Sequence, residues 1–195
     1  MYSTFSIIRI AMPHSSTRNS SKQRLIDAAA KIVSTQGVQE LTLEGVAAMA
    51  GVTKGGLIYH FKTKDDLLGA LVQTMVDELD QGSRINAAKA GNTKGALLRA
   101  LIDDTFERSS EEKQLMGNLL AAASSYPHLL GPVRQLYSRT YSDFTQSGSQ
   151  TGIAMVVVAA LDGIAMLDLL NFHRFSKQQR EAMRRTLHAM AKEII

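Results

Sequence analysis

The chain has no cysteine among its 195 residues. This absence excludes disulfide bonds, thiolate zinc sites and thiol redox sensing, and it fits the reducing cytoplasm, which is the localisation we expect. Histidine does not supply a metal site either, because His14, His128, His173 and His188 are far apart and lack the spacing of paired ligands. We therefore expect neither a metal nor a cofactor.

Motifs of catalysis and nucleotide binding are also missing. The sequence contains no GxGxxG, no Walker pattern and no GxSxG. The acidic pairs Asp65/Asp66 and Asp103/Asp104 are adjacent in helical sequence, so their carboxylates diverge. We interpret them as charge at a helix start and as part of a solvated face. The sequence thus predicts that the protein is not an enzyme.

No segment has the composition expected of a membrane span, so no membrane partner is predicted. The most apolar window, residues 152–170, contains Asp162 and Asp168, and either carboxylate would be costly at the centre of a bilayer. Asp162 interrupts an otherwise apolar helix. We expect it to pair with Arg174 or with a hydroxyl group, or to face a ligand cavity.

Positive charge is concentrated near the start of the chain. Residues 1–64 hold eight Lys and Arg against three Asp and Glu, whereas residues 65–195 hold fourteen against fifteen. A basic N-terminal region followed by a nearly neutral remainder indicates that the N-terminal part binds a polyanion. Chance asymmetry on a solvated surface is the alternative that charge alone leaves open.

Helical periodicity runs through almost the whole sequence, and no strand pattern appears, so we predict an all-α protein of about nine helices. Capping residues mark the first helices: Ser20 or Ser21, Thr42, Thr53, and the capping-box pair Thr63 and Asp66. The polar, glycine-bearing stretch at 81–92 is predicted to be a loop that ends a helix running from Asp65 to Asp80. The last two helices are predicted at 153–172 and 176–194.

Residues 42–61 meet the structural requirements of a helix-turn-helix motif. Ala47 is small where the two helices cross, Gly51 tolerates positive φ in the turn, and Val52 and Leu57 fill the core beneath. The second helix then lies in a DNA major groove. Two glycines at its leading end, Gly55 and Gly56, let the backbone approach the DNA.

The exposed positions of this motif carry groups suited to DNA. Lys54 can donate to guanine, and Ile58 can touch a thymine methyl group. Phosphate contacts are predicted for Tyr59, His60, Lys64 and the helix start at Thr42. Two alternatives remain open from the sequence, namely that His60 is a structural histidine and that Tyr59 packs under the motif with only its hydroxyl exposed.

Residues 24–68 resemble the DNA-binding domain of the TetR family of bacterial transcriptional regulators. The resemblance rests on the helix ending at Gly37, the run LTLEGVAAMAGVTKGGLIYHF and the following KTKDDLL. It implies a homodimer that binds palindromic operator DNA, a C-terminal ligand domain and, usually, repression. By position it implies DNA contacts at Thr42, Thr53, Lys54, Gly55, Tyr59, His60 and Lys64.

Two positions depart from the family pattern. Gly56 stands where Thr, Ser, Ala or Asn is common, and Ile58 stands where Tyr is common, so fewer polar side chains can contact the bases. Recognition of the operator then depends on Lys54, on close approach of the backbone and on DNA shape. The resulting division of the chain is a disordered leader at 1–19, a three-helix DNA-binding domain at 20–64, and a helical regulatory and dimerisation domain at 65–195.

Apolar stripes in the C-terminal region predict a ligand cavity and a dimer interface. The cavity is expected to take a hydrophobic or weakly polar ligand, aromatic or cationic with Asp162 as counter-ion. Its predicted lining is Leu97, Leu101, Phe106, Met116, Leu120, Tyr137, Tyr141, Asp162 and Met166. The predicted dimer interface, on the last two helices, is Met155, Val158, Ala159, Leu187, Met190 and Ile194.

These features together predict a DNA-binding transcriptional regulator, a repressor released from a palindromic operator by a small hydrophobic ligand. The alternative within this class is a DNA-binding regulator without a small-molecule ligand, controlled by a protein partner or acting as an activator. An enzyme with a fused helix-turn-helix and a helical interaction protein that does not bind DNA are the other classes considered.

Overall fold

The computed structural model describes residues 20–123, 125–145 and 148–194, and the predicted leader at 1–19 lies outside them. Within these ranges the chain forms nine α-helices and three short 3-10 turns, and no strand, as the sequence predicts. The first four helices are α1 (Ser21–Gln36), α2 (Leu43–Ala50), α3 (Lys54–His60) and α4 (Lys64–Lys89). The others are α5 (Lys94–Glu107), α6 (Ser110–Ala122), α7 (Leu130–Phe144), α8 (Thr151–Leu169) and α9 (Lys177–Lys192).

The predicted caps begin the first four helices. The hydroxyl oxygens of Ser20, Thr42 and Thr53 each accept a hydrogen bond from a backbone N–H three residues on. Thr63 and Asp66 form a reciprocal capping box at the start of α4. These bonds satisfy N–H groups that have no partner inside the helix, so each helix begins at a defined residue.

The predicted loop at 81–92 is wrong, because α4 continues through it to Lys89. Ser83 and Ala87 lie four residues apart on one face and are both buried, and α4 packs along α5. Tertiary packing of these small side chains thus sustains a helix that sequence polarity argues against. The turn comes only at Gly91 and Asn92, which both have positive φ.

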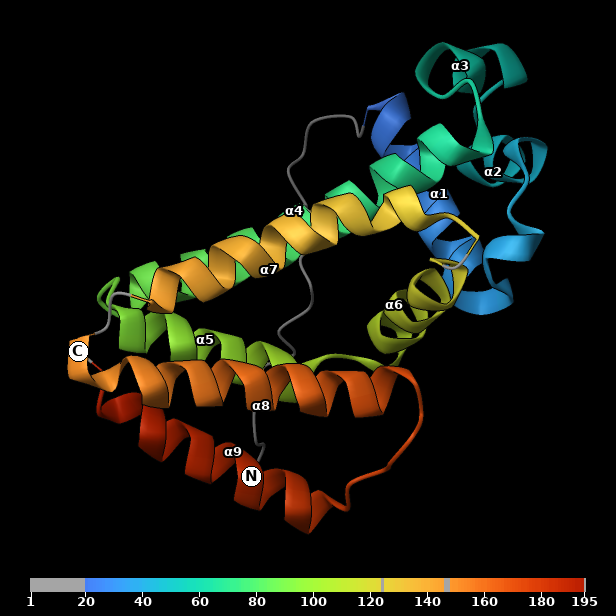
Figure 1. Ribbon diagram of the computed structural model, residues 1–195. Helices are drawn as coiled ribbons and strands as arrows, with labels where there is room; N and C mark the ends of the chain where they lie inside the picture. Colours follow the sequence, from blue (N-terminus) through green and yellow to red (C-terminus); the bar gives the residue numbers. More distant parts are fainter. Residues whose placement is uncertain (1–19, 124, 146–147, 195) are drawn as a thin grey trace, which may run out of the picture.

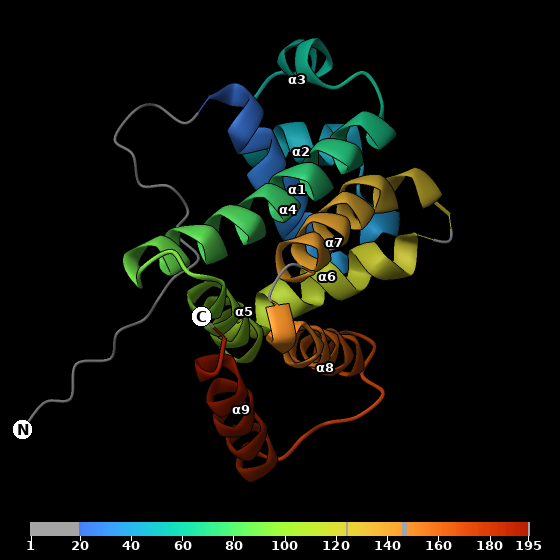
Figure 2. The same ribbon diagram turned by 60° about the vertical axis from the view of Figure 1, so that its left-hand side comes forward.

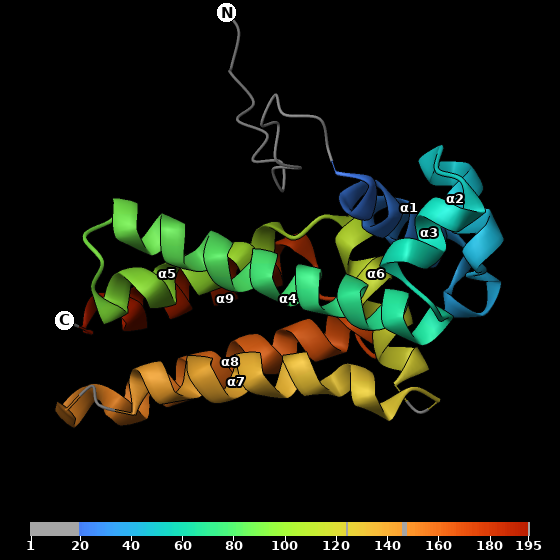
Figure 3. The same ribbon diagram turned by 90° about the horizontal axis from the view of Figure 1, so that it is seen from above.

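Helices α1–α3 gather at one end of the molecule, and α4 leads from them toward α5 at the other end (Figures 1 and 3). α7 runs beside α4, while α8 and α9 lie on the far side of α5 and α6 (Figures 1 and 2). One buried core joins α1–α4 to Leu119 and Ala122 of α6. A second core joins α5, α8 and α9 around Phe144 of α7.

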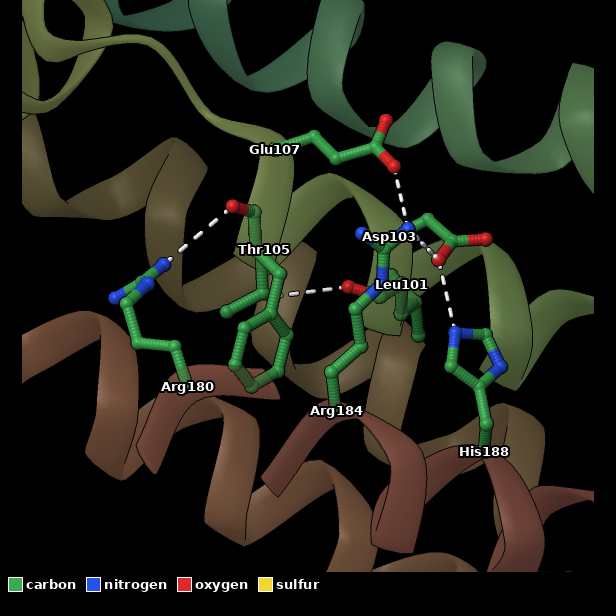
Figure 4. A network of polar contacts seen from close by, with 8 residues as sticks. Leu101, Asp103, Thr105, Glu107, Arg180, Arg184 and His188 are labelled. Atoms are coloured by element: carbon green, nitrogen blue, oxygen red, sulfur yellow. Dashed lines mark hydrogen bonds and ion pairs between the residues drawn. The ribbon is translucent and has the colours of Figure 1, made fainter. Parts of the chain in front are cut away.

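α9 docks on α5 through charged groups as well as apolar ones. Figure 4 shows Arg184 of α9 reaching Asp103 and Glu107 of α5, with His188 on the same Asp103 carboxylate. The Arg184–Asp103 and His188–Asp103 distances are 2.6 and 2.8 Å. α9 is therefore held against its own chain along its inner face.

This docking places part of the predicted dimer interface in the core of a single chain. Val158, Leu187 and Ile194 are buried in the second core of one chain, and Met155 and Met190 pack against that core. Of the predicted set only Ala159 is exposed. Three of the six predicted side chains are therefore core residues of one chain, whereas Met155 and Met190 are partly accessible. The surface at which two protomers meet stays a prediction.

By length and composition alone, residues 148–169 are sufficient to cross a membrane. In the fold, however, Ala154, Val157 and Leu161 of this segment are buried core residues. Asp168 lies in contact with Lys113 and Arg180, at 2.8 Å from each. One face of the segment is thus packed in the core of the bundle.

Candidate DNA interface and internal cavity

The turn between α2 and α3 is closed by a few small and apolar groups. Gly51 adopts a left-handed conformation with φ of 61°, and the Val52 N–H donates to the Ala47 carbonyl at 3.0 Å. Ala47 and Leu57 are buried beneath the turn. The arrangement fixes α3 across α2 with its outer face free, the geometry in which a helix can enter a major groove.

The outer face of α3 lies at the tip of the molecule (Figure 1). Tyr59 is 84% exposed, so it does not pack under the motif. Ile58, Gly55 and Thr53 are exposed as well. The groups predicted to meet DNA at these positions therefore share one accessible surface.

Lys54 stands at the start of this surface and already has a partner. Its ammonium lies 2.8 Å from the carboxylate of Glu44, the second residue of α2. The hydrogen bond between them raises the pKa of Lys54 and lowers that of Glu44. Both side chains are well exposed, so solvent screens the attraction and the pair is open to exchange for a DNA group. Glu44 was not among the predicted site residues, because only the folded turn places it beside Lys54.

The two glycines of α3 have different surroundings within the protein. A Cβ on Gly55 would meet no atom within 4 Å, so the protein itself does not demand a bare backbone there. A Cβ on Gly56 would lie 2.9 Å from Val52 Cγ1 and 3.2 Å from Thr53 Oγ1. Close packing inside the motif thus gives a reason for Gly56 within the protein, whereas Gly55 has none. Close approach of the backbone to DNA at these glycines stays a prediction.

His60 and Lys64 lie where α3 gives way to α4. The His60 ring is partly buried and contacts Tyr59 edge-on, with ring centroids 5.0 Å apart. Lys64, at the first position of α4, is partly buried and its ammonium lies 3.4 Å from the Gln39 carbonyl. Thr42, at the start of α2, is exposed.

An internal cavity of about 390 Å³ lies between α4, α5, α6, α7 and α8. Its lining is mainly apolar, which suits the interior of a small-molecule site. Eight of the nine side chains predicted for a cavity line it: Leu97, Leu101, Met116, Leu120, Tyr137, Tyr141, Asp162 and Met166.

Phe106 is the exception and is a correction to the predicted lining. It belongs instead to the packing around α8 and α9. The Arg180 guanidinium of α9 lies over the Phe106 ring, 5.2 Å from its centroid, and donates to the Phe106 carbonyl at 3.4 Å. The ring therefore supports the contact between α5 and α9.

Asp162 is a half-buried carboxylate on the cavity wall. It accepts a hydrogen bond from the Tyr141 hydroxyl at 2.6 Å, and Tyr137 also bonds to it. Burial raises the pKa of Asp162, and burial together with this bond raises the pKa of Tyr141 to about 12. Of the two partners expected from the sequence, the hydroxyl is present, whereas Arg174 bonds to Asn171.

Asp104 also lines the cavity, which corrects its assignment to a solvated face. It accepts a hydrogen bond from Ser83 at 2.5 Å, and burial raises its pKa. Arg108, the residue directly after α5, lines the cavity too, and burial lowers its pKa. Asp104 and Glu112 act on Arg108 electrostatically, although no direct ion pair joins it to any residue that the structure describes.

α6 connects the cavity to the α1–α3 end of the molecule, a link that the sequence did not predict. Its residues Met116, Leu119 and Leu120 line the cavity. On another face, Asn118 donates to the Val33 carbonyl of α1 at 2.7 Å, and Glu111 pairs with Lys31 of α1 at 2.8 Å. Long-range contacts of this kind leave no signal in local periodicity.

Metal-binding groups do not accumulate at either site. Across the described ranges, no three His, Asp or Glu side chains come together in an arrangement that could hold a metal ion. The first site is an exposed helix whose Lys54 is paired with Glu44, and the second is a partly open, mainly apolar cavity with a few polar groups. The chemistry of both sites is suited to binding, of a polyanion at α3 and of a small molecule in the cavity.

Comparison with known proteins agrees with this organisation. Residues 25–71 match the model for bacterial regulatory proteins of the tetR family, and residues 95–192 match the model for the tetracyclin repressor-like C-terminal domain. The HTH-type transcriptional regulator BetI of Serratia proteamaculans (strain 568) is 25% identical over 173 residues, covering 83% of this chain and 87% of that protein.

Two similar solved structures extend the likeness to the fold. A TetR-family member from Streptomyces coelicolor A3 is 27% identical with a TM-score of 0.66, covering 88% of this chain and 98% of that one. The multidrug binding protein EbrR complexed with ethidium is 26% identical with a TM-score of 0.64, covering 87% and 98%. The two family models together span both halves of the fold. The chain therefore belongs to the tetR family, whose members are helix-turn-helix transcriptional regulators and not enzymes.

Proposed function

We propose that the protein is a cytoplasmic homodimeric repressor that leaves a palindromic operator when a small hydrophobic ligand fills its cavity. The observation that carries this proposal is the double role of α4. Leu67, Leu68 and Leu71 of α4 are buried in the core shared with α1–α3. Met75 and Leu79 of the same helix line the cavity. A ligand that displaces these two side chains moves the DNA-binding end.

The proposed DNA contacts follow the exposed surface of the motif. Lys54 reads guanine after exchanging Glu44 for a base edge, and Ile58 meets a thymine methyl group. Tyr59, His60 and Lys64 contact phosphates, as do Thr53 and the helix start at Thr42. Gly55, whose Cβ position is open, lets the backbone come close to the DNA.

Release needs only a small movement at the DNA. Two recognition helices of a dimer must lie about 34–36 Å apart, or a suitable multiple, to enter successive major grooves. A swing of α4 by a few ångströms in each protomer takes one helix out of register. The ligand must bind the two spacings with different affinity, since equal affinity would shift nothing. The EbrR complex with ethidium supports a small molecule as the effector.

The experiment begins by selecting bound fragments from genomic DNA with the purified protein, which yields the operator. Operator affinity is then measured with and without a ligand shown to occupy the cavity. We expect the ligand to lower operator affinity by at least tenfold, corresponding to a coupling of about 1.4 kcal/mol. A ligand that fills the cavity but leaves operator affinity unchanged would contradict release and favour control by a protein partner.

A further inference from the structure

The ionisable groups of the cavity fall into two sets. Asp80, Arg84 and Asp143 of its lining neutralise one another, with Arg84 at 2.8 Å from each carboxylate and Arg139 at 3.4 Å from Asp80. Because each of these charges has an opposite charge in contact, none of them requires a ligand.

The second set is formed by Asp104, Arg108 and Asp162. Asp104 of α5 and Arg108, the residue after its last turn, attract one another through space, and Glu112 acts on Arg108 as well. These charges therefore offset one another in part, although no direct ion pair joins Arg108 to any residue that the structure describes. Asp162 differs, because its bonding partners are the neutral hydroxyls of Tyr137 and Tyr141. In the described part of the chain no Lys, Arg or His forms an ion pair with Asp162.

We propose, resting on the ligand-controlled function above, that the effector is an organic cation with one positive charge and an apolar body, and that its charge is bound at Asp162. A half-buried carboxylate without a counter-ion is unfavourable in a mainly apolar cavity, and a single bound cation relieves it. A neutral ligand would leave the Asp162 carboxylate without a counter-ion, and an anionic ligand would be repelled by it.

The rings beside Asp162 are arranged to hold such a charge. Tyr137 and Tyr141 are stacked, with centroids 6.5 Å apart and an interplanar angle of 18°. Both line the cavity and both bond to Asp162. Aromatic faces attract cations through their quadrupole, and they also accept flat aromatic bodies. Carboxylate and rings together form a receptor for a positively charged ring system or alkylammonium group.

The test compares ethidium with its neutral de-ethylated parent, which has the same ring system without the permanent charge. Binding to the full-length protein is measured by titration calorimetry in the absence of DNA. We expect the wild-type protein to prefer ethidium by roughly tenfold or more. The Asp162→Asn variant should lose this preference because only its affinity for ethidium falls. Its affinity for the neutral parent should change by less than about threefold.

Asp143→Asn is the matched control, because it removes a carboxylate of the same cavity that Arg84 already neutralises. It should keep the preference for ethidium. Circular dichroism of each variant verifies folding. Equal binding of both probes to the wild-type protein, no binding of either, or a preference that survives in Asp162→Asn would each overturn the proposal. Operator affinity is measured separately, so ethidium that binds through Asp162 without releasing DNA would contradict the repressor function and leave the ligand class standing.

Discussion

Lys54 and Asp162 are the two residues at which charge matters most for the proposed functions, and their situations are opposite. Lys54 has an exposed partner, Glu44, that solvent screens and that DNA can replace. Asp162 is half-buried and has only hydroxyl partners. The exposed pair therefore keeps the Lys54 ammonium available for DNA at little energetic cost. The Asp162 carboxylate is unfavourable inside the fold, and a cationic ligand can relieve this.

Replacing the two lysines of the motif should affect DNA binding in different ways. Lys54→Ala removes a base contact, so it should reduce discrimination between operator and unrelated DNA by about 1–3 kcal/mol. Lys64→Ala removes a phosphate contact, so it should weaken binding to every sequence and lower the salt dependence by about one unit of slope. Titrations of operator and scrambled DNA at several salt concentrations measure both effects.

Glu44→Gln is the control for these substitutions, because it frees Lys54 without removing it. Loss of a negative charge next to the DNA should raise affinity for all sequences slightly. If Lys54→Ala and Lys64→Ala gave the same specificity profile, the division into a base contact and a phosphate contact would be wrong.

Asp162→Asn should raise the stability of the unliganded protein at neutral pH. Burial raises the pKa of Asp162 in the folded state above that of an unfolded aspartate, so the folded carboxylate is unfavourable wherever it is ionised. The gain from Asn is present at pH 7 and is lost as the pH falls toward 4, where the wild-type residue is protonated as well. Thermal unfolding should show a rise of roughly 2–4 °C for each 1 kcal/mol gained. A lower melting temperature at pH 7 would mean that the tyrosine hydrogen bonds outweigh burial.

Helices and their caps are the scale at which sequence and structure agree best. The capping box of Thr63 and Asp66 could be read from spacing because both partners lie within one turn. The length of α4 could not, since Ser83 and Ala87 are helical only through their burial against α5. The cavity lining followed from helical stripes, and Phe106 departed from it because Arg180 lies far away in sequence.

Two glycine substitutions test how closely the helices pack. Gly95→Ala should destabilise the fold by about 1–3 kcal/mol, because its Cβ would collide with the Ile194 carbonyl and lie 3.1 Å from that of Ala191. Gly82→Ala is the matched control in α4, where nothing lies within 4 Å. It should stabilise by about 0.4–1 kcal/mol through helix propensity and reduced unfolded-state entropy. Urea unfolding measures both, and a stabilised Gly95→Ala protein would contradict the close approach of α5 and α9.

At the scale of the whole molecule, we propose that the partner protomer binds to one exposed apolar face, which lies on α8. α8 buries one face in its own chain and leaves a second face open, with Val156 59% and Met166 39% exposed. Between them the outward positions are small, and the outward stripe recurs at intervals of three and four residues: Gly152, Val156, Ala159, Gly163 and Met166. Small residues at this spacing allow two helices to approach closely along one seam.

The final prediction concerns this stripe, which keeps Ala159 of the interface expected from the sequence and omits the residues that are buried in the core of one chain. Val156→Asp places a charge within the proposed seam, while the buried core of α8 is left intact, so the chain should fold but remain monomeric. The matched control is Ile85→Asp, which changes an equally exposed apolar residue of α4, 54% exposed, away from the stripe. Sedimentation should show a dimer for the wild-type protein and the control, and a monomer for Val156→Asp at micromolar concentration. The monomer should also lose most of its operator affinity, because one recognition helix reaches only one half-site. A dimeric Val156→Asp protein, or a monomeric wild type, would show that the open face of α8 is not what joins the protomers.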